Sequence, residues 1–161
     1  MTRDKRGFSL VELLTVVTLV GVASAIAVPN IMSQMPKWHV NGSTRDVMSK
    51  LMMARLKAIQ NNKEYAILFT FGDTDSYKLQ RKSGGTWQDE GSATEAPTDV
   101  TMEFGGQSAC NDNRVNFNAN GTAGCTPVWV KTKDSAYRRK ISIDANTGRI
   151  SVKFCEKEAC T

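Results

Sequence analysis

Histidine and the residue groupings of common enzymes are nearly missing from this 161-residue chain, whose single histidine is His39. No glycine-rich phosphate loop follows an apolar run, and no Ser/His/Asp set can be recovered from the spacing. The carboxylate pair Asp89-Glu90 stands in a stretch rich in glycine and threonine, which is typical of a solvated turn. The sequence therefore argues against an enzyme, and we expect no cofactor.

Cysteine pairs with CxxC spacing are also missing, and zinc sites usually need such pairs or paired histidines. The Asp73-Thr74-Asp75 segment lacks the further ligands of an EF-hand loop, so no metal site is predicted. An even number of cysteines beyond a membrane segment instead indicates disulfides formed in an oxidising compartment. Three connectivities are possible, and the one needing least loop closure pairs neighbours along the chain. The four candidates are Cys110 with Cys125 and Cys155 with Cys160.

Charge is almost absent from residues 8–28, a run of 21 residues whose only ionisable side chain is Glu12. At about 1.5 Å per residue, a helix of this length is roughly 32 Å long and can cross a bilayer core. Residues 1–7 are basic and should stay in the cytoplasm, which leaves the rest of the chain outside. An ordinary signal peptide, with Ala23-Ser24-Ala25 as its cleavage site, is the alternative.

Glu12 argues against a signal peptide, because an unpaired carboxylate one turn inside an apolar run costs several kcal/mol. Such a charge needs a partner. Cleavage after Gly7 would create a cationic amine at Phe8, four residues before Glu12. The two opposite charges can then pair within one chain or between neighbouring chains.

The segment Gly7-Phe8-Ser9-Leu10-Val11-Glu12 resembles the class III signal of type IV pilins and type II secretion pseudopilins. That signal has Gly before the cut, an apolar residue (usually Phe) after it, and Glu at the fifth mature position. The resemblance implies that a membrane prepilin peptidase removes residues 1–7 and N-methylates Phe8. It also implies that Glu12 meets the Phe8 amine of a neighbouring subunit and that packed apolar helices hold the filament core.

A helix-breaking proline is common in these proteins at the place of Pro29. Gly21, Pro29 and Pro36 weaken the helix, and we expect it to extend or bend at these positions.

Beyond Pro36 the apolar residues first recur at helical spacing, to about Asn61-Asn62, and then at strand spacing. The strands expected are 65–71, 77–82, 100–104, 114–117, 128–131, 140–144 and 149–154, with residues 84–97 as an exposed loop around Trp87. The prediction is an α+β chain of four parts. These are a leader (1–7), a membrane helix (8–28), a linker and amphipathic helix (29–62) and a β-rich domain (63–161).

Three later segments resemble the GspH/FimT group of minor pilins and pseudopilins. Residues 51–62 are similar to its L-x-x-A-R-x-x-A-I-x-x-N stretch, residues 115–121 to its F-x-x-x-G strand and turn, and residues 141–150 to its closing G-R-[IV] hairpin. The resemblance implies a pilin-like fold, in which a long N-terminal helix packs on an antiparallel β domain. The middle of the chain departs from many members, since it is reduced to Gly84-Gly85-Thr86-Trp87.

Minor members of this group are thought to prime or cap filaments. Two systems remain open, a type IV pilus and a type II secretion system; the Cys155 and Cys160 pair is more like type IV pilus subunits. The implied partners are other pilins or pseudopilins, the prepilin peptidase and the inner-membrane assembly platform. The implied location is the bacterial inner membrane, with the C-terminal domain in the periplasm, and then the filament.

Basic residues gather at the end of the chain, where residues 131–161 hold eight basic and four acidic side chains. Some competence-linked members of the group bind DNA through a Gly-Arg-x-Arg motif. Here Gly148-Arg149-Ile150 matches, but Ser151 replaces the second arginine. The phosphate contacts would come from Arg138, Arg139, Lys140, Arg149 and Lys153. A solvated turn is the alternative, and the missing arginine favours it.

Overall fold

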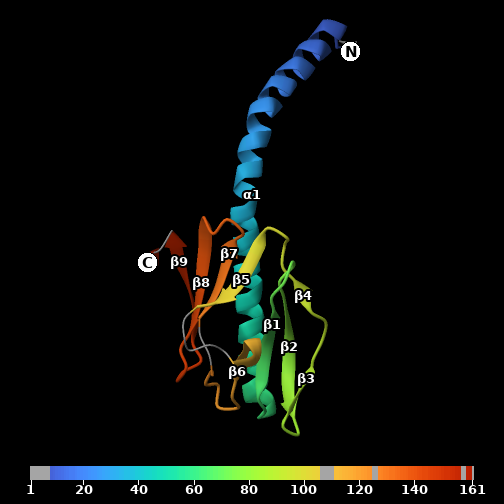
Figure 1. Cartoon of the computed structure of the whole chain (residues 1–161). Coiled ribbons are helices and arrows are strands. Elements are labelled where there is room, and N and C mark those ends of the chain that lie inside the picture. Colours follow the sequence, from blue (N-terminus) through green and yellow to red (C-terminus); the bar gives the residue numbers. More distant parts are fainter. Residues whose placement is uncertain (1–7, 106–110, 125–126, 157–158, 161) are drawn as a thin grey trace, which may run out of the picture. The chain divides into compact units, whose positions relative to one another are not determined.

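The computed structural model describes residues 8–105, 111–124, 127–156 and 159–160. Within them the chain forms one long α-helix, followed by strands of two antiparallel sheets and a single 3-10 turn (Figure 1). The elements are α1 Leu10–Asn61, β1 Tyr65–Thr70, β2 Ser76–Ser83, β3 Thr86–Asp89, β4 Thr94–Glu95, β5 Val100–Phe104, η1 Asn111–Asn113, β6 Arg114–Phe117, β7 Val128–Thr132, β8 Tyr137–Ile143, β9 Ile150–Glu156 and β10 Ala159–Cys160. The α+β fold class predicted from the sequence, a long helix packed on antiparallel β structure, is confirmed.

The chain divides into two compact units, Met1–Met35 and Pro36–Thr161. Helix α1 runs through both and is uninterrupted at Gly21, Pro29 and Pro36. The residues that follow Pro29, which the sequence predicts as a linker, are therefore helical. A proline removes one intrahelical hydrogen bond, and the intact turns on either side hold the backbone helical. That the helix extends or bends at these positions stays a prediction.

In the second unit, α1 buries one face against the sheets. Its buried apolar residues are spaced by three, four or seven positions, which keeps them on one side of the helix: Val40, Val47, Leu51, Ala54 and Ala58. Thr44 on the same face is also buried, and its hydroxyl donates to the carbonyl of Val40 (2.6 Å). Since burial of a large aliphatic side chain contributes about 1.5–3 kcal/mol, this face rather than helix propensity holds α1 in place.

The strands form two sheets, in the order β3-β2-β1-β6 with β4 beside β2, and β10-β9-β8-β7-β5. Burial alternates along the strands: on β6, Val115 and Phe117 face the core, and on β7, Val128 and Val130 do. The predicted bounds of β5 and β6 agree with the structure. Strand β8, by contrast, begins three residues earlier than predicted, at Tyr137.

The stretch expected as an exposed loop, residues 84–97, holds strands β3 and β4. Ser83 pairs with Thr86 across Gly84 and Gly85, whose φ angles are 60° and 85°. Two central residues with positive φ make the tight turn that matches the twist of a hairpin, so the two glycines form a β-turn. The loop predicted for this stretch is therefore wrong at Gly84-Gly85, where the pair of glycines is a hairpin signal.

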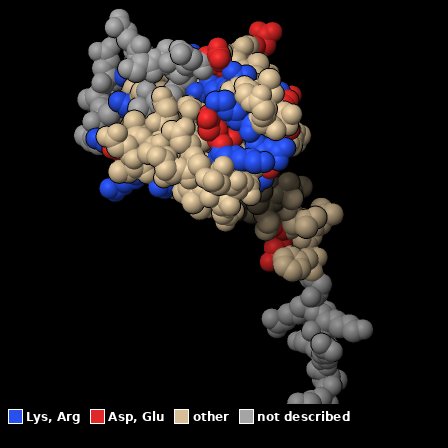
Figure 2. All heavy atoms as spheres, turned by 90° about the horizontal axis from the view of Figure 1, so that it is seen from below, with Lys and Arg blue, Asp and Glu red and all other residues tan. Residues whose placement is uncertain are grey.

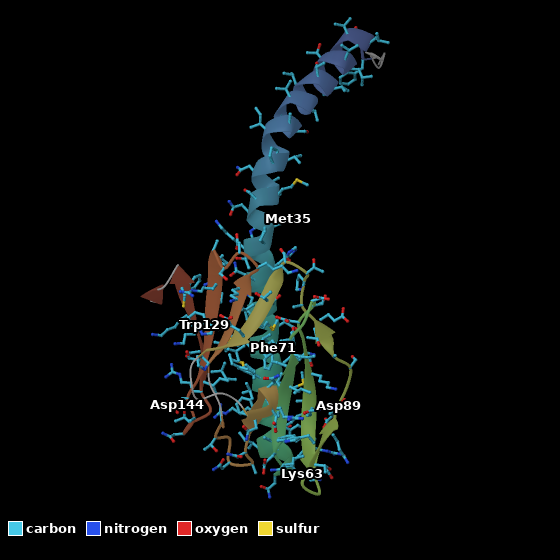
Figure 3. The ribbon with its side chains drawn as sticks, in the orientation of Figure 1. Met35, Lys63, Phe71, Asp89, Trp129 and Asp144 are labelled. Atoms are coloured by element: carbon cyan, nitrogen blue, oxygen red, sulfur yellow. The ribbon has the colours of Figure 1, made fainter. Side chains whose placement is uncertain are left out.

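Asp75 joins the two sheets. Its carboxylate is buried and accepts hydrogen bonds from the backbone N–H of Gly72 (3.0 Å) and of Met102 in β5 (2.5 Å). The ring of Phe71 (Figure 3), the residue after β1, lies edge-on to that of Phe104 in β5, with 5.5 Å between ring centres. The side chain of Asp75 is therefore occupied by backbone donors, and no cluster of metal-binding residues occurs in the described part of the chain.

We expect Asp75→Ala to lower the free energy of unfolding by about 2–4 kcal/mol, because the buried amide of Met102 and the partly buried amide of Gly72 lose a charged acceptor. Urea unfolding of the full chain in mild detergent, followed by near-ultraviolet circular dichroism, measures the change. Asp73→Ala, two residues away at an exposed position, is the matched control and should change stability by less than about 0.5 kcal/mol. Equal effects of the two substitutions would contradict the role of Asp75.

Candidate functional site

The N-terminal unit is an apolar helix without a core. Its large side chains are exposed in this chain, from Phe8 (80%) through Leu19 (66%) to Ile26 (74%). The helix is long and apolar enough to cross a membrane, by length and composition alone, as a signal sequence also would be. Gly7 lies outside the described residues.

Polar side chains in this helix are mostly satisfied by its own backbone. The hydroxyls of Thr15, Thr18 and Ser24 each donate to the carbonyl four residues earlier, at 2.8 Å. Glu12, in the first turn, has no hydrogen bond or ion pair among the described residues. The helix dipole favours a negative charge at this end, but an apolar surrounding would still require a cationic partner.

In the second unit, the three segments that resemble the GspH/FimT group meet at Arg55. From α1, its Nε donates to the carbonyl of Gly121 (3.2 Å) in the loop after β6, and its Nη2 donates to that of Thr147 (2.8 Å) in the β8–β9 turn. The two loops also touch directly, since the N–H of Ala123 donates to the carbonyl of Ala145 (3.0 Å). One guanidinium therefore joins the helix to both sheets, as the planar fork of arginine allows.

Gly148 is required at this meeting point. Its φ is +63°, and a Cβ there would lie 1.9 Å from the carbonyl oxygen of Gly121 and 2.8 Å from Nε of Arg55. Beside it, the carboxylate of Asp144 accepts from the backbone N–H (2.8 Å) and the hydroxyl (3.0 Å) of Thr147. These bonds, the backbone one first, hold the pKa of Asp144 below its usual range. The turn is thus shaped by glycine and held by Asp144.

The basic residues predicted for phosphate contacts fall on two faces of sheet B, the sheet of β5 and β7–β10. Four of them, Arg138, Lys140, Arg149 and Lys153, are on its outer side and form what we call the basic sheet face. Arg138 and Lys140 flank the ring of Trp129, at 5.1 and 5.4 Å from its centre. Trp129 (Figure 3) was not singled out from the sequence, although its place in a predicted strand before Lys131 marks it as a neighbour of the cations.

Arg139 is a correction to that set. It is 7% exposed, because side chains alternate along β8 and this one points to the inner face. Its Nε and Nη2 donate to Oδ1 of Asn41 in α1, at 2.9 and 2.6 Å. A buried guanidinium held in this way is not placed to contact phosphate.

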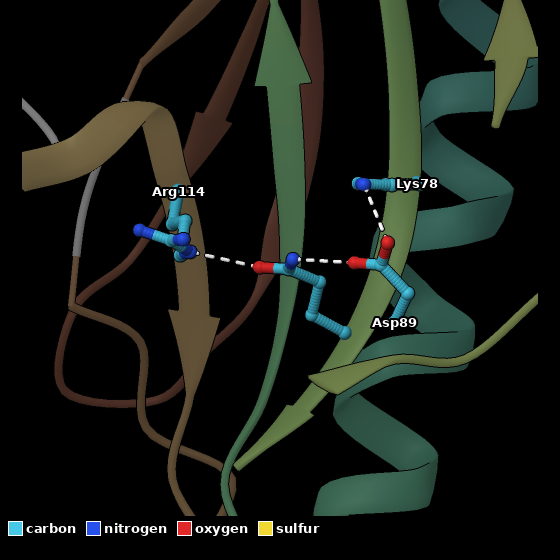
Figure 4. A network of polar contacts seen from close by, with 4 residues as sticks. Lys78, Asp89 and Arg114 are labelled. Carbon is cyan, nitrogen blue, oxygen red and sulfur yellow. Dashed lines mark hydrogen bonds and ion pairs between the residues drawn. The ribbon is translucent and has the colours of Figure 1, made fainter. Parts of the chain in front are cut away.

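Many basic and acidic side chains elsewhere in the unit form ion pairs at its surface, and the two kinds of charge are interleaved in the view from below (Figure 2). On the outer face of the first sheet, Asp89 binds Lys78 (2.6 Å) and Gln80 (2.6 Å), and Gln80 in turn accepts from Arg114 (2.8 Å; Figure 4). The bond from Gln80, followed by that from Lys78, holds the pKa of Asp89 below its usual range. Because these charges already pair with each other, they indicate an ordinary solvated surface rather than a binding site.

Two of the four predicted disulfide residues, Cys110 and Cys125, lie outside the described residues. Cys155 is disulfide-bonded, and the backbone register of β9 and β10 places Cys160 opposite it. The connectivity itself stays a prediction.

Comparisons with known proteins agree with two parts of this picture. Residues 2–28 match the model of the prokaryotic N-terminal methylation motif. A search of curated proteins found no match. Two solved structures of the minor pseudopilin EpsH from the type 2 secretion system of Vibrio cholerae share the fold. One has a TM-score of 0.57 at 14% identity over 71% of this chain and 95% of EpsH, and the other 0.55 at 15% over 75% and 96%.

We expect Gly148→Ala to destabilise the chain by about 2–4 kcal/mol, since the new Cβ meets a backbone oxygen at a strained φ. Gly42→Ala is the control, because Gly42 is helical and exposed and has nothing within 4 Å of a new Cβ. It should stabilise by about 0.5–1 kcal/mol. Thermal unfolding of both variants measures the two opposite shifts, and a shift of the same sign in both would contradict this reading of the turn.

Proposed function

We propose that this chain, whose N-terminal motif and fold support membership of the type IV pilin and pseudopilin superfamily, is a minor pilin-like subunit of a type IV pilus. Its role is structural, in the initiation, assembly or tip of the filament, after a prepilin peptidase cuts between Gly7 and Phe8. The observation that carries the proposal is the carboxylate of Glu12. It is the one ionisable side chain of residues 8–28, an otherwise apolar and exposed stretch of the helix, and the cut would create its partner amine.

Before assembly, the apolar helix sits in the inner membrane as a single span, with the second unit in the periplasm. The basic leader supports this orientation, because positive flanks stay in the cytoplasm. In the filament the exposed face of the helix is covered by the helices of neighbouring pilins. The partners are these subunits, the prepilin peptidase and the inner-membrane assembly platform.

A minor pseudopilin of a type II secretion system is the alternative, supported by the fold shared with EpsH. At 14–15% identity that likeness concerns the fold alone. The disulfide at Cys155, near the C-terminus, is more typical of type IV pilus subunits and favours the pilus. The genes beside this one, encoding either pilus or secretion components, distinguish the two systems.

The mature protein should begin with N-methyl-Phe8, as shown by intact mass and N-terminal sequencing of protein isolated from cells. A start near Ile26 would mean an ordinary signal peptide and would overturn the proposal.

The role of Glu12 is tested by Glu12→Gln, since this substitution keeps the size of the side chain and removes the charge. We expect it to be cut normally but to be at least about tenfold depleted from sheared pili, as loss of a buried ion pair costs several kcal/mol. Normal incorporation of the Glu12→Gln protein would contradict the role of Glu12.

A second candidate function is DNA binding by the basic sheet face. Lys140 and Lys153 are direct cross-strand partners, and like charges placed opposite each other destabilise a sheet. Together with Arg138, Arg149 and the ring of Trp129 they form a cationic surface on one side of the sheet. The phosphates of a polyanion would offset this repulsion by pairing with both lysines, and the release of condensed counterions would favour binding further.

The full chain in mild detergent should retard duplex DNA at low salt, and less at moderate salt. Replacing Lys140 and Lys153 together by Gln should weaken binding by at least about tenfold and reduce the salt dependence. The matched control replaces Lys50 and Lys63, which lie outside this face, by Gln and should leave binding nearly unchanged. The absence of retardation at low salt would exclude this function without affecting the pilin proposal.

A further inference from the structure

The second unit contains a hollow of about 290 Å³ between α1 and the β8–β9 pair, which we call the α1–β9 groove. Its lining comes from the helix on one side and from the inner face of sheet B on the other: Asn41, Thr44, Arg45, Met48, Arg139, Val152 and Phe154. It lies on the opposite face of β8 from the basic sheet face, because Arg139 alternates with Arg138 and Lys140 along the strand. The groove is therefore a separate site.

Arg139 lies in this groove as a buried cation that pairs with no carboxylate of the described residues. Its guanidinium donates twice to the amide oxygen of Asn41, and the same oxygen accepts from the hydroxyl of Tyr137 (3.1 Å). The ring of Phe154 lies 3.1 Å from the guanidinium carbon. No carboxylate pairs with Arg139 within the described residues. A neutral amide and an aromatic face offset only part of the desolvation of a buried charge, so an anion at this position would be strongly favoured.

Arg45 adds a second cation at the same groove. It follows Asn41 by one helical turn, is exposed, and has no ion pair in the described part of the chain. Apart from Asn41 and Thr44, the remaining lining is apolar: Met48 comes from the helix, and Val152 and Phe154 come from β9. Phe154 is 60% exposed, although its ring lies against the buried guanidinium of Arg139. The groove thus combines two arginines with an uncovered apolar wall.

We infer that the α1–β9 groove binds an acidic side chain that stands next to a large apolar side chain on a partner protein. The carboxylate pairs with Arg139 and Arg45, since arginine donates in a fork that matches a carboxylate. The apolar neighbour covers Met48, Val152 and Phe154. The volume suits two side chains rather than a helix, and the apolar wall suits a peptide better than a strongly hydrated phosphate. This site is independent of which filament system the chain serves.

The probe is the blocked dipeptide N-acetyl-Glu-Leu-amide, and its matched control is N-acetyl-Gln-Leu-amide, which differs only in charge. The full chain is held in lipid nanodiscs with ¹³C-methyl methionine, and both peptides are titrated by NMR. We expect the Glu peptide to shift the methyl signal of Met48 saturably, while Met102, buried elsewhere in the core, stays still. The Gln peptide should bind at least about tenfold more weakly, because it lacks the charge.

Two variants assign the charge partner. Arg45→Gln and Arg139→Gln should each weaken binding of the Glu peptide by about fivefold or more. Arg149→Gln, which removes an exposed cation from the β8–β9 turn, should leave that binding unchanged. The methyl signal of Met102 reports whether each variant is folded. If Arg139→Gln does not fold, Arg45→Gln, at an exposed position, tests the charge pairing by itself. Equal binding of the two peptides, or no shift of Met48 in folded protein, would overturn the inference. Neither result bears on cleavage at Gly7 or on filament incorporation.

Discussion

The contact of Arg55 with two backbone carbonyls is the interaction on which the arrangement of the second unit depends. Apolar burial alone would let the helix slide or rotate over the sheets, because the hydrophobic effect is not directional. Arg55 removes this freedom by binding Gly121 in the loop after β6 and Thr147 in the turn before β9. Asp75 does the same between the two sheets, and Asn41 does it between the helix and β8. The hydrogen bonds of Arg55, Asp75 and Asn41 therefore fix how the helix and the two sheets are aligned, which apolar packing alone does not.

Helix α1 has a different distribution of apolar residues in each of the two units of the chain. In Pro36–Thr161, α1 buries a single stripe, and its other side mixes polar residues with exposed apolar ones such as Leu56 and Ile59. In Met1–Met35, the helix is apolar on all sides and buries none of its described residues. A helix that is apolar all round is stable in lipid or among other helices, so this unit requires an apolar surrounding that the described residues do not supply. The methylation motif matched over residues 2–28 fits this requirement.

Residue spacing predicts much of the secondary structure, but it does not predict which side chains from distant segments contact each other. Helical and strand periods located α1 and most strands, because these signals are local. Arg55 and Thr147, by contrast, are 92 residues apart, and nothing in their spacing shows that they touch; only the family resemblance had marked their segments. Arg138, Arg139 and Lys140 read as one basic cluster while β8 was expected to start at Lys140. Once the strand begins at Tyr137, alternation sends Arg139 inward and its two neighbours outward.

The uninterrupted passage of α1 through Pro29 and Pro36 has a mechanical consequence. Each proline lacks the amide that would bond to the carbonyl four residues earlier, so Ala25 and Met32 lose their usual donors. Seven residues are close to two full turns, which puts both missing bonds on the same side of the helix. Its flexural stiffness is therefore lower in one plane than in the plane at right angles. Bending along this part of the rod has a preferred direction, set by two imino acids at the spacing of a heptad.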